Sequence, residues 1–434
     1  MKQLLLILPF LFLLLQAKGQ TVLTLDEAIA LALKHNFDIT LARNDALYLK
    51  TNNTAGAAGM LPNISLSGSG QYALRNVVSS ESETNTTDAY SLGVATLNSG
   101  IELSWTLFDG GKMFVTKNKL NELEAMGEIQ YKAQVQQTLS EVIAAYYNIV
   151  KQKQQLASIE QTIRYNLERV KISETGYNAG SRKKTDLLQA RIDLNVNREN
   201  AIVQQAAIAQ ARRELARMLY ISETLPFDVY NDFTFDYQPD REQLLKEIYG
   251  QNNRVQVLQK RVDIQDLVVS ESRRSLFPKI NLLAGYYLNN TGTTLLPGTS
   301  LSTTRTLWPQ AGGSVSVPLF MGGNLQRQLA LAKIDREQAE IELEKEKLKV
   351  YTELLNALTA FEKQQELLKI EQENCELTKE SLEISLQRMR LGEATSLEVR
   401  LAQEDFEQSS TRLTNFRYSL KIAETNLKKL LGKL

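Results

Sequence analysis

The sequence predicts a mainly α-helical protein with a small β part: long antiparallel coiled-coil helices, and four strands per chain that contribute to an oligomeric membrane β-barrel. Three observations predict this fold. The chain is a tandem duplication, it holds two very long stretches with few helix breakers, and it has four segments in which apolar and polar residues alternate. Apolar residues recur every three or four positions in an amphipathic helix and every two in a strand, which distinguishes the elements.

The composition excludes several classes of function. The 434 residues carry 50 basic and 50 acidic side chains, so the net charge is zero, and such a chain has no overall field that attracts nucleic acid. His35 is the single histidine and Cys375 the single cysteine. Histidine clusters for a metal, histidine relays and an intrachain disulfide are thereby excluded. We expect no enzyme activity, no cofactor, no metal and no nucleic-acid partner.

The N-terminus has the features of a secretory signal peptide over residues 1–19. Lys2 supplies a positive charge, residues 4–15 are apolar, and Ala17-Lys18-Gly19 resembles a small-x-small cleavage site. The alternative is a short membrane anchor, but the apolar run is too short to span a bilayer and no stop-transfer pattern follows. Because no later stretch approaches 18 uninterrupted apolar residues, a membrane role would have to use strands.

A duplication organises the chain. Residues 107–111 (LFDGG) correspond to residues 319–323 (LFMGG) at an offset of 212, and the same offset relates Gly180 to Gly392. Self-similarity kept over this length indicates a repeat architecture. We therefore predict that each half of the chain folds with the same order of elements.

The repeat boundaries follow from this register. Upstream of the strands the offset becomes 216, since residues 61–64 (LPNI) correspond to 277–280 (FPKI). One loop is therefore four residues longer in the first half. We assign residues 20–222 to repeat 1, 223–239 to a linker and 240–434 to repeat 2.

Each repeat is expected to contain three helices. The ranges, given for repeat 1 and then repeat 2, are 24–58 and 240–274 for the first helix, 112–178 and 324–390 for the long helix, and 183–220 and 395–431 for the last. In the long helix of repeat 1 a coiled-coil apolar stripe is predicted, formed by Leu139, Val142, Tyr146, Ile149, Leu156, Ile159, Ile163, Leu167 and Val170.

Helix lengths predict how these elements pack. About 66 residues at 1.5 Å each give a rod of roughly 100 Å. The first and last helices of a repeat together match that length, so we expect them to stack end to end beside the long helix. Gly180 and Gly392 would then lie in the turns at one end.

The strands are predicted from alternation of apolar and polar residues. Two strand pairs, within residues 63–108 and 279–320, are made of segments 63–75, 99–108, 279–290 and 312–320. The links 76–98 and 290–311 are rich in Ser, Thr, Asn and Gly and are expected to be loops. Such alternation is typical of outer-membrane strands, although soluble amphipathic sheets show it too.

Aromatic residues near the strand ends favour the membrane interpretation; the alternative is that they fill a soluble core. The predicted aromatic belt consists of Trp105, Trp308, Tyr72, Phe108, Tyr286 and Phe320. Four strands are too few to close a barrel, and open sheet edges are not tolerated in lipid. The chain is therefore predicted to be oligomeric.

The order of motifs resembles the TolC-type outer-membrane efflux and secretion channels over essentially all of the mature chain. The residues that carry the resemblance are 23–28 (LTLDEA) with His35-Asn36, 60–62 (MLP) and its counterpart 276–278 (LFP), the joints 105–112 and 317–324, and the turns at Gly180-Ser181 and Gly392-Glu393, each followed by an acid.

The resemblance implies a passive exit duct. Three chains would give a 12-stranded barrel in the outer membrane, in contact with its lipid, and their helices would form an α-helical barrel through the periplasm. An inner-membrane transporter and a periplasmic adaptor would dock at the helix tips, and small molecules or polypeptides would be exported. Drug or metal efflux and type I protein secretion both fit. A different class of function, a periplasmic coiled-coil scaffold with docking hairpins, shares the helices but does not account for the alternating strands.

The resemblance also implies a periplasmic gate at the tips. The residues assigned to it are Asp186, Glu398, Arg388, Arg390, Tyr177 and Glu404, and those assigned to the turns and the adaptor contact are Gly180, Ser181, Gly392 and Glu393. The sequence departs from the family pattern at Leu401 and Ala394, where an acid and an arginine are often found. The simpler alternative is that these charges are solvated helix ends, where ion pairs contribute little stability.

Overall fold

A computed structural model describes residues 21–81, 86–221, 227–235 and 237–434. The predicted signal peptide, residues 1–19, lies outside this part of the chain. Contacts divide the chain into two compact units, each of which contains segments of both repeats. We call them the helical unit, residues up to 45, 129–256 and 345–434, and the sheet unit, residues 46–128 and 257–344.

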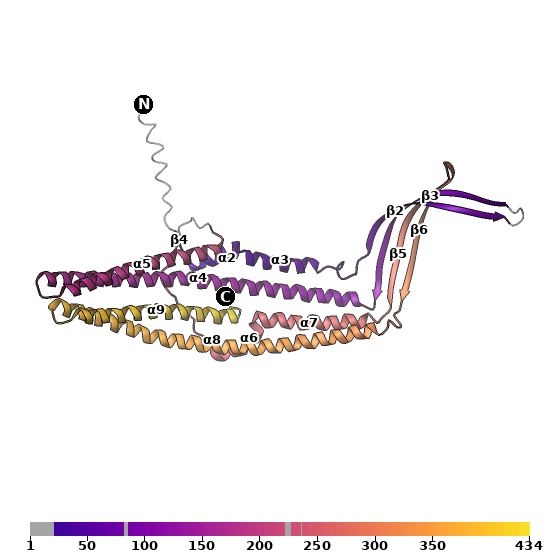
Figure 1. The fold of residues 1–434 in the computed structure, drawn as a ribbon. Helices are drawn as coiled ribbons and strands as arrows, with labels where there is room; N and C mark the ends of the chain where they lie inside the picture. Colours follow the sequence, from indigo (N-terminus) through magenta and orange to yellow (C-terminus); the bar gives the residue numbers. More distant parts are fainter. Residues whose placement is uncertain (1–20, 82–85, 222–226, 236) are drawn as a thin grey trace, which may run out of the picture. The chain divides into compact units, whose positions relative to one another are not determined.

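The order of elements is the same in the two repeats (Figure 1). In repeat 1 they are β1 (Thr21–Leu23), α2 (Leu25–His35), α3 (Phe37–Asn52), β2 (Asn63–Glu81), β3 (Thr86–Asp109), α4 (Lys112–Asn178) and α5 (Lys184–Leu219). After it come β4 (Phe227–Val229), α6 (Arg241–Gln251), α7 (Asn253–Arg274), β5 (Lys279–Leu295), β6 (Thr299–Ser316), α8 (Asn324–Leu391) and α9 (Ser396–Leu430).

The long and last helices agree with the sequence prediction, but the predicted first helices do not. Residues 24–58 and 240–274 do not form single helices, because each range contains a break, at Asn36 in repeat 1 and Asn252 in repeat 2. Both asparagines have extended backbone angles, with ψ of 128° and 117°. Extended backbone ends one helix and begins the next, so only α3 and α7 continue toward the strands.

Asn36 ties three helix ends together. Its backbone N–H donates to the Ala32 carbonyl at the end of α2, 2.9 Å away. Its Oδ1 accepts from the amides of Asp38 and Ile39 in the first turn of α3, at 2.9 and 3.2 Å. Its Nδ2 donates to the Met218 carbonyl at the end of α5, at 3.0 Å. One side chain therefore caps α3 and holds it against α5.

Asn252 makes the same contacts in repeat 2. Its Oδ1 accepts from the amides of Arg254 and Val255 at 3.0 and 3.3 Å, and its Nδ2 donates to the Leu430 carbonyl at 2.9 Å. Both asparagines are buried. The end-to-end contact of the first and last helices is therefore present in each repeat, made by α3 with α5 and by α7 with α9.

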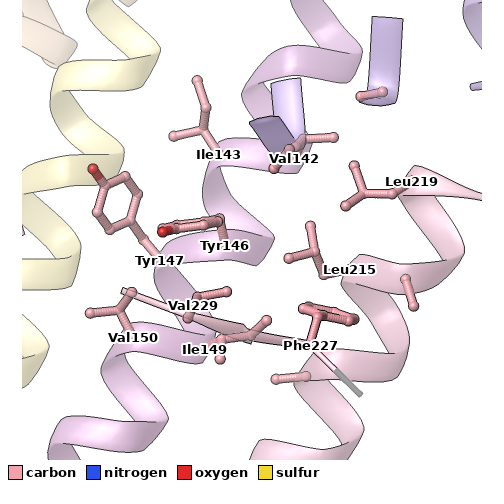
Figure 2. Close-up of a cluster of buried hydrophobic side chains, with 14 of the residues drawn as sticks. Val142, Ile143, Tyr146, Tyr147, Ile149, Val150, Leu215, Leu219, Phe227 and Val229 are labelled. Atoms are coloured by element: carbon pink, nitrogen blue, oxygen red, sulfur yellow. The ribbon is translucent and has the colours of Figure 1, made fainter. Parts of the chain in front are cut away.

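An apolar core surrounds the middle of α4 in the helical unit (Figure 2). Val142, Tyr146 and Ile149 of the predicted stripe are buried there, and α5 contributes Leu215 and Leu219. In Figure 2 these side chains from α4 and α5 point toward one another. The predicted stripe is wrong at Leu167, whose side chain is 45% exposed.

The linker between the repeats is anchored to this core. β4 pairs in parallel with β1, and Asp228 within it accepts from Lys153 of α4 and Arg212 of α5, at 2.9 and 2.8 Å. Burial raises the pKa of the Asp228 carboxyl, but the hydrogen bonds from Lys153, the Val229 amide and Arg212 outweigh it, so the pKa is lowered. The carboxylate therefore stays charged and holds β4 against two helices.

A second anchor holds the linker to α9. Lys421 donates to the Thr234 carbonyl at 2.8 Å and pairs with Glu424 at 3.0 Å. Its ammonium lies 5.3 Å from the centre of the Tyr147 ring, which points toward the pale yellow helix in Figure 2. Because Lys421 and Glu424 are both buried, each satisfies a charge that would otherwise be costly to bury.

The sheet unit contains a four-stranded antiparallel sheet in the order β2-β3-β5-β6 (Figure 1). Its strands are longer than predicted. Much of the ranges 76–98 and 290–311, expected to be loops, is strand, because β2 and β3 stay paired as far as Glu81 and Thr86 and β5 and β6 as far as Leu295 and Thr299. These ranges are rich in Ser, Thr, Asn and Gly and lack the regular alternation of apolar and polar residues from which strands are predicted. The predicted segment 312–320 is too long, since β6 ends at Ser316.

The register brings the predicted apolar residues onto one face. Leu66, Ile101 and Tyr286 are directly opposite one another on β2, β3 and β5, and cross-strand partners share a face. Trp105 lies on this face opposite Leu282. These side chains are exposed or half-buried in the single chain, so the sheet presents an apolar face that the chain does not cover.

The two cap asparagines generate a testable prediction. Replacing Asn252 with Asp keeps Oδ1 for the amides of α7 but puts a carboxylate oxygen against the Leu430 carbonyl. We expect Asn252→Asp to lower the free energy of unfolding by about 1–3 kcal/mol, the usual penalty for an unmade buried hydrogen bond. Thermal unfolding of the detergent-solubilised protein by circular dichroism measures this.

Asn195, exposed on α5, supplies the matched control, since Asn195→Asp makes the same chemical change on a solvated face. Equal melting temperatures for the two variants would show that the amide of Asn252 does not hold α9.

Candidate functional site

The turn between α4 and α5 is built on glycine. Gly180 has φ of +73°, a left-handed conformation that side chains disfavour. The amides of Ser181 and Arg182 donate to the Gly176 carbonyl at 2.8 and 3.1 Å, and the Ser181 hydroxyl donates to it at 3.0 Å. These bonds satisfy a carbonyl at the end of α4 and reverse the chain.

The turn between α8 and α9 repeats this design with a different start to the second helix. Gly392 has φ of +82°, and the Glu393 amide donates to the Arg388 carbonyl at 2.9 Å. Thr395 then caps α9: its hydroxyl oxygen accepts from the Glu398 amide at 3.2 Å, and the Glu398 carboxylate lies 3.5 Å from the Thr395 amide. This reciprocal arrangement is a capping box.

The two assigned gate acids therefore differ. The carboxylate of Glu398 caps α9 and lies 3.9 Å from the Arg388 guanidinium. Asp186 lies in the first turn of α5, which lacks a side-chain cap, and its side chain is partly exposed. A carboxylate there suits the positive end of the helix dipole. Asp186 is thus the acid with fewer contacts inside the chain.

Near the glycine turns, two polar contacts join the first helical hairpin, α4–α5, to the second, α8–α9. Arg390 of α8 forms an ion pair with Glu168 of α4. Arg182, in the first turn, donates to the Met389 carbonyl near the end of α8 at 2.7 Å. The contacts of Arg388, in contrast, stay within its own hairpin: its guanidinium contacts the Glu393 carbonyl and the Glu398 carboxylate. Of the assigned arginines, Arg390 is therefore the one that links the hairpins.

The sequence pattern does not distinguish Arg182 from its neighbours Lys183 and Lys184. The signal lies in Gly176, because a Cβ added there would come within 2.6–3.1 Å of the Arg182 side chain. A glycine one helical turn before Gly180 lets the arginine cross α4 and reach α8. Two glycines spaced four apart at a helix end therefore mark a crossing side chain as well as a turn.

The departure from the family pattern at Ala394 has a structural reason. Ala394 is 5% exposed and belongs to an apolar cluster with Met389, Val399 and Phe406, so a larger charged residue would not fit there. Glu404 pairs with Arg400 on its own helix at 3.6 Å. Burial, and secondly the charge of Glu404, raise the pKa of the nearby Glu407.

The assigned aromatic residues do not all lie on one face of the sheet. The Trp105 Nε1 donates to the Met60 carbonyl at 2.9 Å. Trp308 lies directly opposite Tyr287, whereas the neighbouring Tyr286 is on the face of Trp105. Because successive residues of a strand point to opposite faces, Trp308 lies on the opposite face from Trp105. Its ring stacks on Tyr287 with centroids 5.6 Å apart. Tyr72 and Phe108 share the face of Trp105, whereas Phe320 follows the end of β6.

In the part of the chain that the structure describes, no group of three or more His, Cys, Asp or Glu side chains is placed to hold a metal ion. None of the described helices is both long and apolar enough to cross a membrane.

Comparison with known families decides the assignment. The family described as "Outer membrane efflux protein" matches residues 28–219 and again residues 244–433. The chain belongs to this family. The two matched regions follow the internal duplication, and together they cover most of the chain.

Individual proteins that are similar to this efflux protein support the family assignment. The outer membrane efflux protein BepC of Brucella suis biovar 1 (strain 1330) is 23% identical over 427 residues, which cover 96% of this chain and 87% of BepC. Crystal structures of CusC have the same fold, with a TM-score of 0.75 at 20% identity, covering 94% of this chain and 92% of CusC. The Campylobacter jejuni CmeC outer membrane channel matches with a TM-score of 0.75 at 20% identity, covering 94% and 85% of the two chains.

The protein is therefore an outer-membrane exit duct of the efflux type, with a periplasmic extension. Fold and family are those of channel proteins rather than enzymes. The predicted family resemblance, fold class and location are confirmed.

The contacts between hairpins yield a prediction for this efflux protein. Arg390→Ala removes the ion pair with Glu168, so we expect the tips to separate more readily and single-channel conductance in planar bilayers to rise several-fold. Arg388→Ala is the matched control, because it removes an arginine two residues away whose contacts stay within one hairpin. A conductance that rises equally in both variants, or in neither, would contradict a specific role for Arg390.

Proposed function

We propose that three copies of the chain close into one ring, forming the passive duct of a tripartite efflux or type I secretion system. A periplasmic adaptor and an inner-membrane transporter would engage its helix tips, and the transporter would supply the energy for export of small molecules or polypeptides. Two uncovered surfaces, the sheet edges and one line of α8, support the ring. The resemblance to TolC-type channels supplies the number three.

The sheet edges support an assembly of several copies. Within the described residues, β2 pairs only with β3 and β6 only with β5, so each leaves one edge free. Backbone groups at a free edge have no partner in hydrocarbon, and this excludes an open four-stranded sheet from the membrane. Antiparallel pairing of β2 with β6 of a neighbour would continue the alternation of strand direction and close the barrel.

A line of apolar residues on α8 supports the same conclusion in the helical unit. Ile370, Leu377, Ile384 and Leu391 are spaced seven apart and are exposed, Leu377 and Ile384 by 56% and 49%. A heptad spacing places them on one side of a long helix, as at a coiled-coil seam. Soluble helices rarely leave such a seam without a partner.

The duplication indicates what covers this line. At an offset of 212, Leu377 and Ile384 correspond to Tyr165 and Ile172 of α4. Those two residues pack against the apolar cluster of α8 and α9, where Tyr165 meets the Phe406 ring at 6.1 Å. In repeat 1 the long helix is thus covered by the last helix of repeat 2. By the same relation, α8 should be covered by α5 of another copy.

The matching surface on α5 is available. Exposed apolar residues on α5 are Leu188, Ile192, Val196, Ile202 and Val203. Because the faces of α8 and α5 differ, their contact joins unlike surfaces, as does the contact of β2 with β6. Contacts between unlike surfaces close into rings when the rotation between copies allows it.

A substitution in the α8 line tests the ring. Ile384→Asp would place a charge in the proposed contact between copies, and we expect it to shift the detergent-solubilised protein from trimer to monomer. Lys379→Asp is the control, because it also adds an acid to an exposed position of α8 but away from the line. Size-exclusion chromatography with light scattering measures the mass. A trimer in both variants, or a monomeric wild type, would refute the proposed interface.

A further inference from the structure

The polar face of the sheet, opposite the apolar face that carries Trp105, holds a compact group of aromatic and acidic side chains. Residues directly opposite one another on neighbouring strands share a face, and so do residues two apart on one strand. Two adjacent cross-strand rows of β3, β5 and β6 form the group: Gly100, Tyr287 and Trp308 in one row, and Glu102, Gly285 and Gln310 in the next.

Two glycines make room for the ring of Tyr287. A Cβ added at Gly285 would lie 2.7 Å from the Tyr287 Cζ and hydroxyl oxygen, and one added at Gly100 would lie 2.6 Å from the Tyr287 Cδ1. Glycine within a strand often marks such a close approach. The ring therefore lies against both glycines, and its hydroxyl donates to the Glu102 Oε2 at 3.2 Å.

Trp308 extends the aromatic surface onto β6. Its ring stacks on Tyr287 with an interplanar angle of 27°, and its side chain is 37% exposed in the single chain. An aromatic side chain that covers a strand glycine stabilises a sheet, which accounts for the position of Tyr287. It does not account for the second ring or for a carboxylate beside the pair.

The charge of Glu102 is not neutralised by a neighbouring basic residue. Within the described strands, the basic residues nearest to it on this face are Lys279 and Arg75. They lie six residues along β5 and ten residues along β3 from the row of Glu102, which corresponds to roughly 20 and 33 Å. The carboxylate beside the two rings is therefore available to an external cation.

We propose that Glu102, Tyr287 and Trp308 form a binding site for an organic cation with apolar substituents, such as a quaternary ammonium. Aromatic faces attract such a cation through the ring quadrupole, tryptophan most strongly, and the Glu102 carboxylate adds the opposite charge. Hard inorganic cations need several oxygen ligands, whereas these three side chains offer one carboxylate. The chemistry therefore favours an organic ligand over a metal ion.

The location of this site in the assembly rests on the proposed ring. The apolar face of the sheet would contact lipid, so the opposite face would line the duct. In the ring, β2 of the next copy would lie beside Trp308. Its residues on the duct-lining face are small or polar, and they leave the tryptophan accessible: Asn63, Ser65, Ser67, Ser69, Gln71 and Ala73.

Tryptophan fluorescence tests the site, because Trp308 is one of two tryptophans in the chain. We expect tetraethylammonium chloride to change the emission of the detergent-solubilised protein saturably, and sodium chloride at the same ionic strength not to do so. Trp308→Leu should abolish the response. Glu102→Gln, which keeps an acceptor for the Tyr287 hydroxyl but removes the charge, should weaken binding roughly fivefold.

Tyr286→Leu is the matched control, because it removes the adjacent aromatic ring on the opposite face, and it should bind with the affinity of the wild type. The absence of a saturable response in the wild type overturns the site. A response that survives Trp308→Leu, or equal affinities of the wild type and Glu102→Gln, does so too.

Single-channel current separates a failure of this site from a failure of the ring. Its three residues belong to one chain, so binding does not require the ring, whereas block requires that they line a closed duct. We expect tetraethylammonium to reduce the current in planar bilayers, with a half-blocking concentration raised roughly fivefold by Glu102→Gln. Saturable binding by fluorescence without block would support the site and contradict the ring. Block that is equal in Glu102→Gln and wild type would overturn the site.

Discussion

Unpaired backbone groups at the two edges of the sheet constrain the whole structure. A chain that places four strands in a membrane must pair β2 and β6 with other strands, since hydrocarbon offers no hydrogen bonds. This requirement makes the single chain incomplete and gives a reason for the uncovered line on α8. The sheet and the helices thus favour neighbouring copies for different reasons, unmade hydrogen bonds in one case and exposed apolar surface in the other, and both proposed contacts join unlike surfaces.

Continuity from strands to helices depends on a few residues that break regular structure. Gly110 and Gly111, with φ of +73° and +76°, turn the chain from β3 into α4, and Gly322 and Gly323 do so before α8. A Cβ at Gly110 would come within 2.7 Å of the Arg274 carbonyl, so only glycine fits there. Asn36 and Asn252 serve the other joints, where three helix ends meet around one amide side chain.

Much of the fold could be predicted from the sequence because its signals are local and repeated. The long helices run over 67 and 68 residues with no proline and with glycine only in α4, at Gly127 and Gly176, and the glycine turns recur at a constant offset. The breaks at Asn36 and Asn252 escaped prediction because part of what holds them, the hydrogen bonds to the Met218 and Leu430 carbonyls, comes from residues far away in the sequence. The lengths of the strands escaped too, since their outer parts are rich in Ser, Thr, Asn and Gly and lack regular alternation.

The candidate site was predicted less completely. The glycine turns lie where the sequence predicts them, but the crossing of Arg182 depends on a contact with a residue 207 positions away in the sequence. Trp308 was grouped with Trp105 because both lie in or beside the predicted strand pairs; the register between strands decides which face each occupies.

The route of the linker has a consequence for symmetry. Asp228 of the linker binds α4 and α5, and Lys421 of α9 binds the linker. The linker therefore connects the two repeats of one chain at this position along the helices. Because the linker is a segment of one chain, it does not connect the repeats of neighbouring chains. In a ring of three duplicated chains, six similar helical hairpins would lie side by side. The linker would connect only alternate boundaries, those between the two hairpins of one chain. Widening of the duct at the position of the linker would therefore be shared unequally between boundaries within a chain and boundaries between chains.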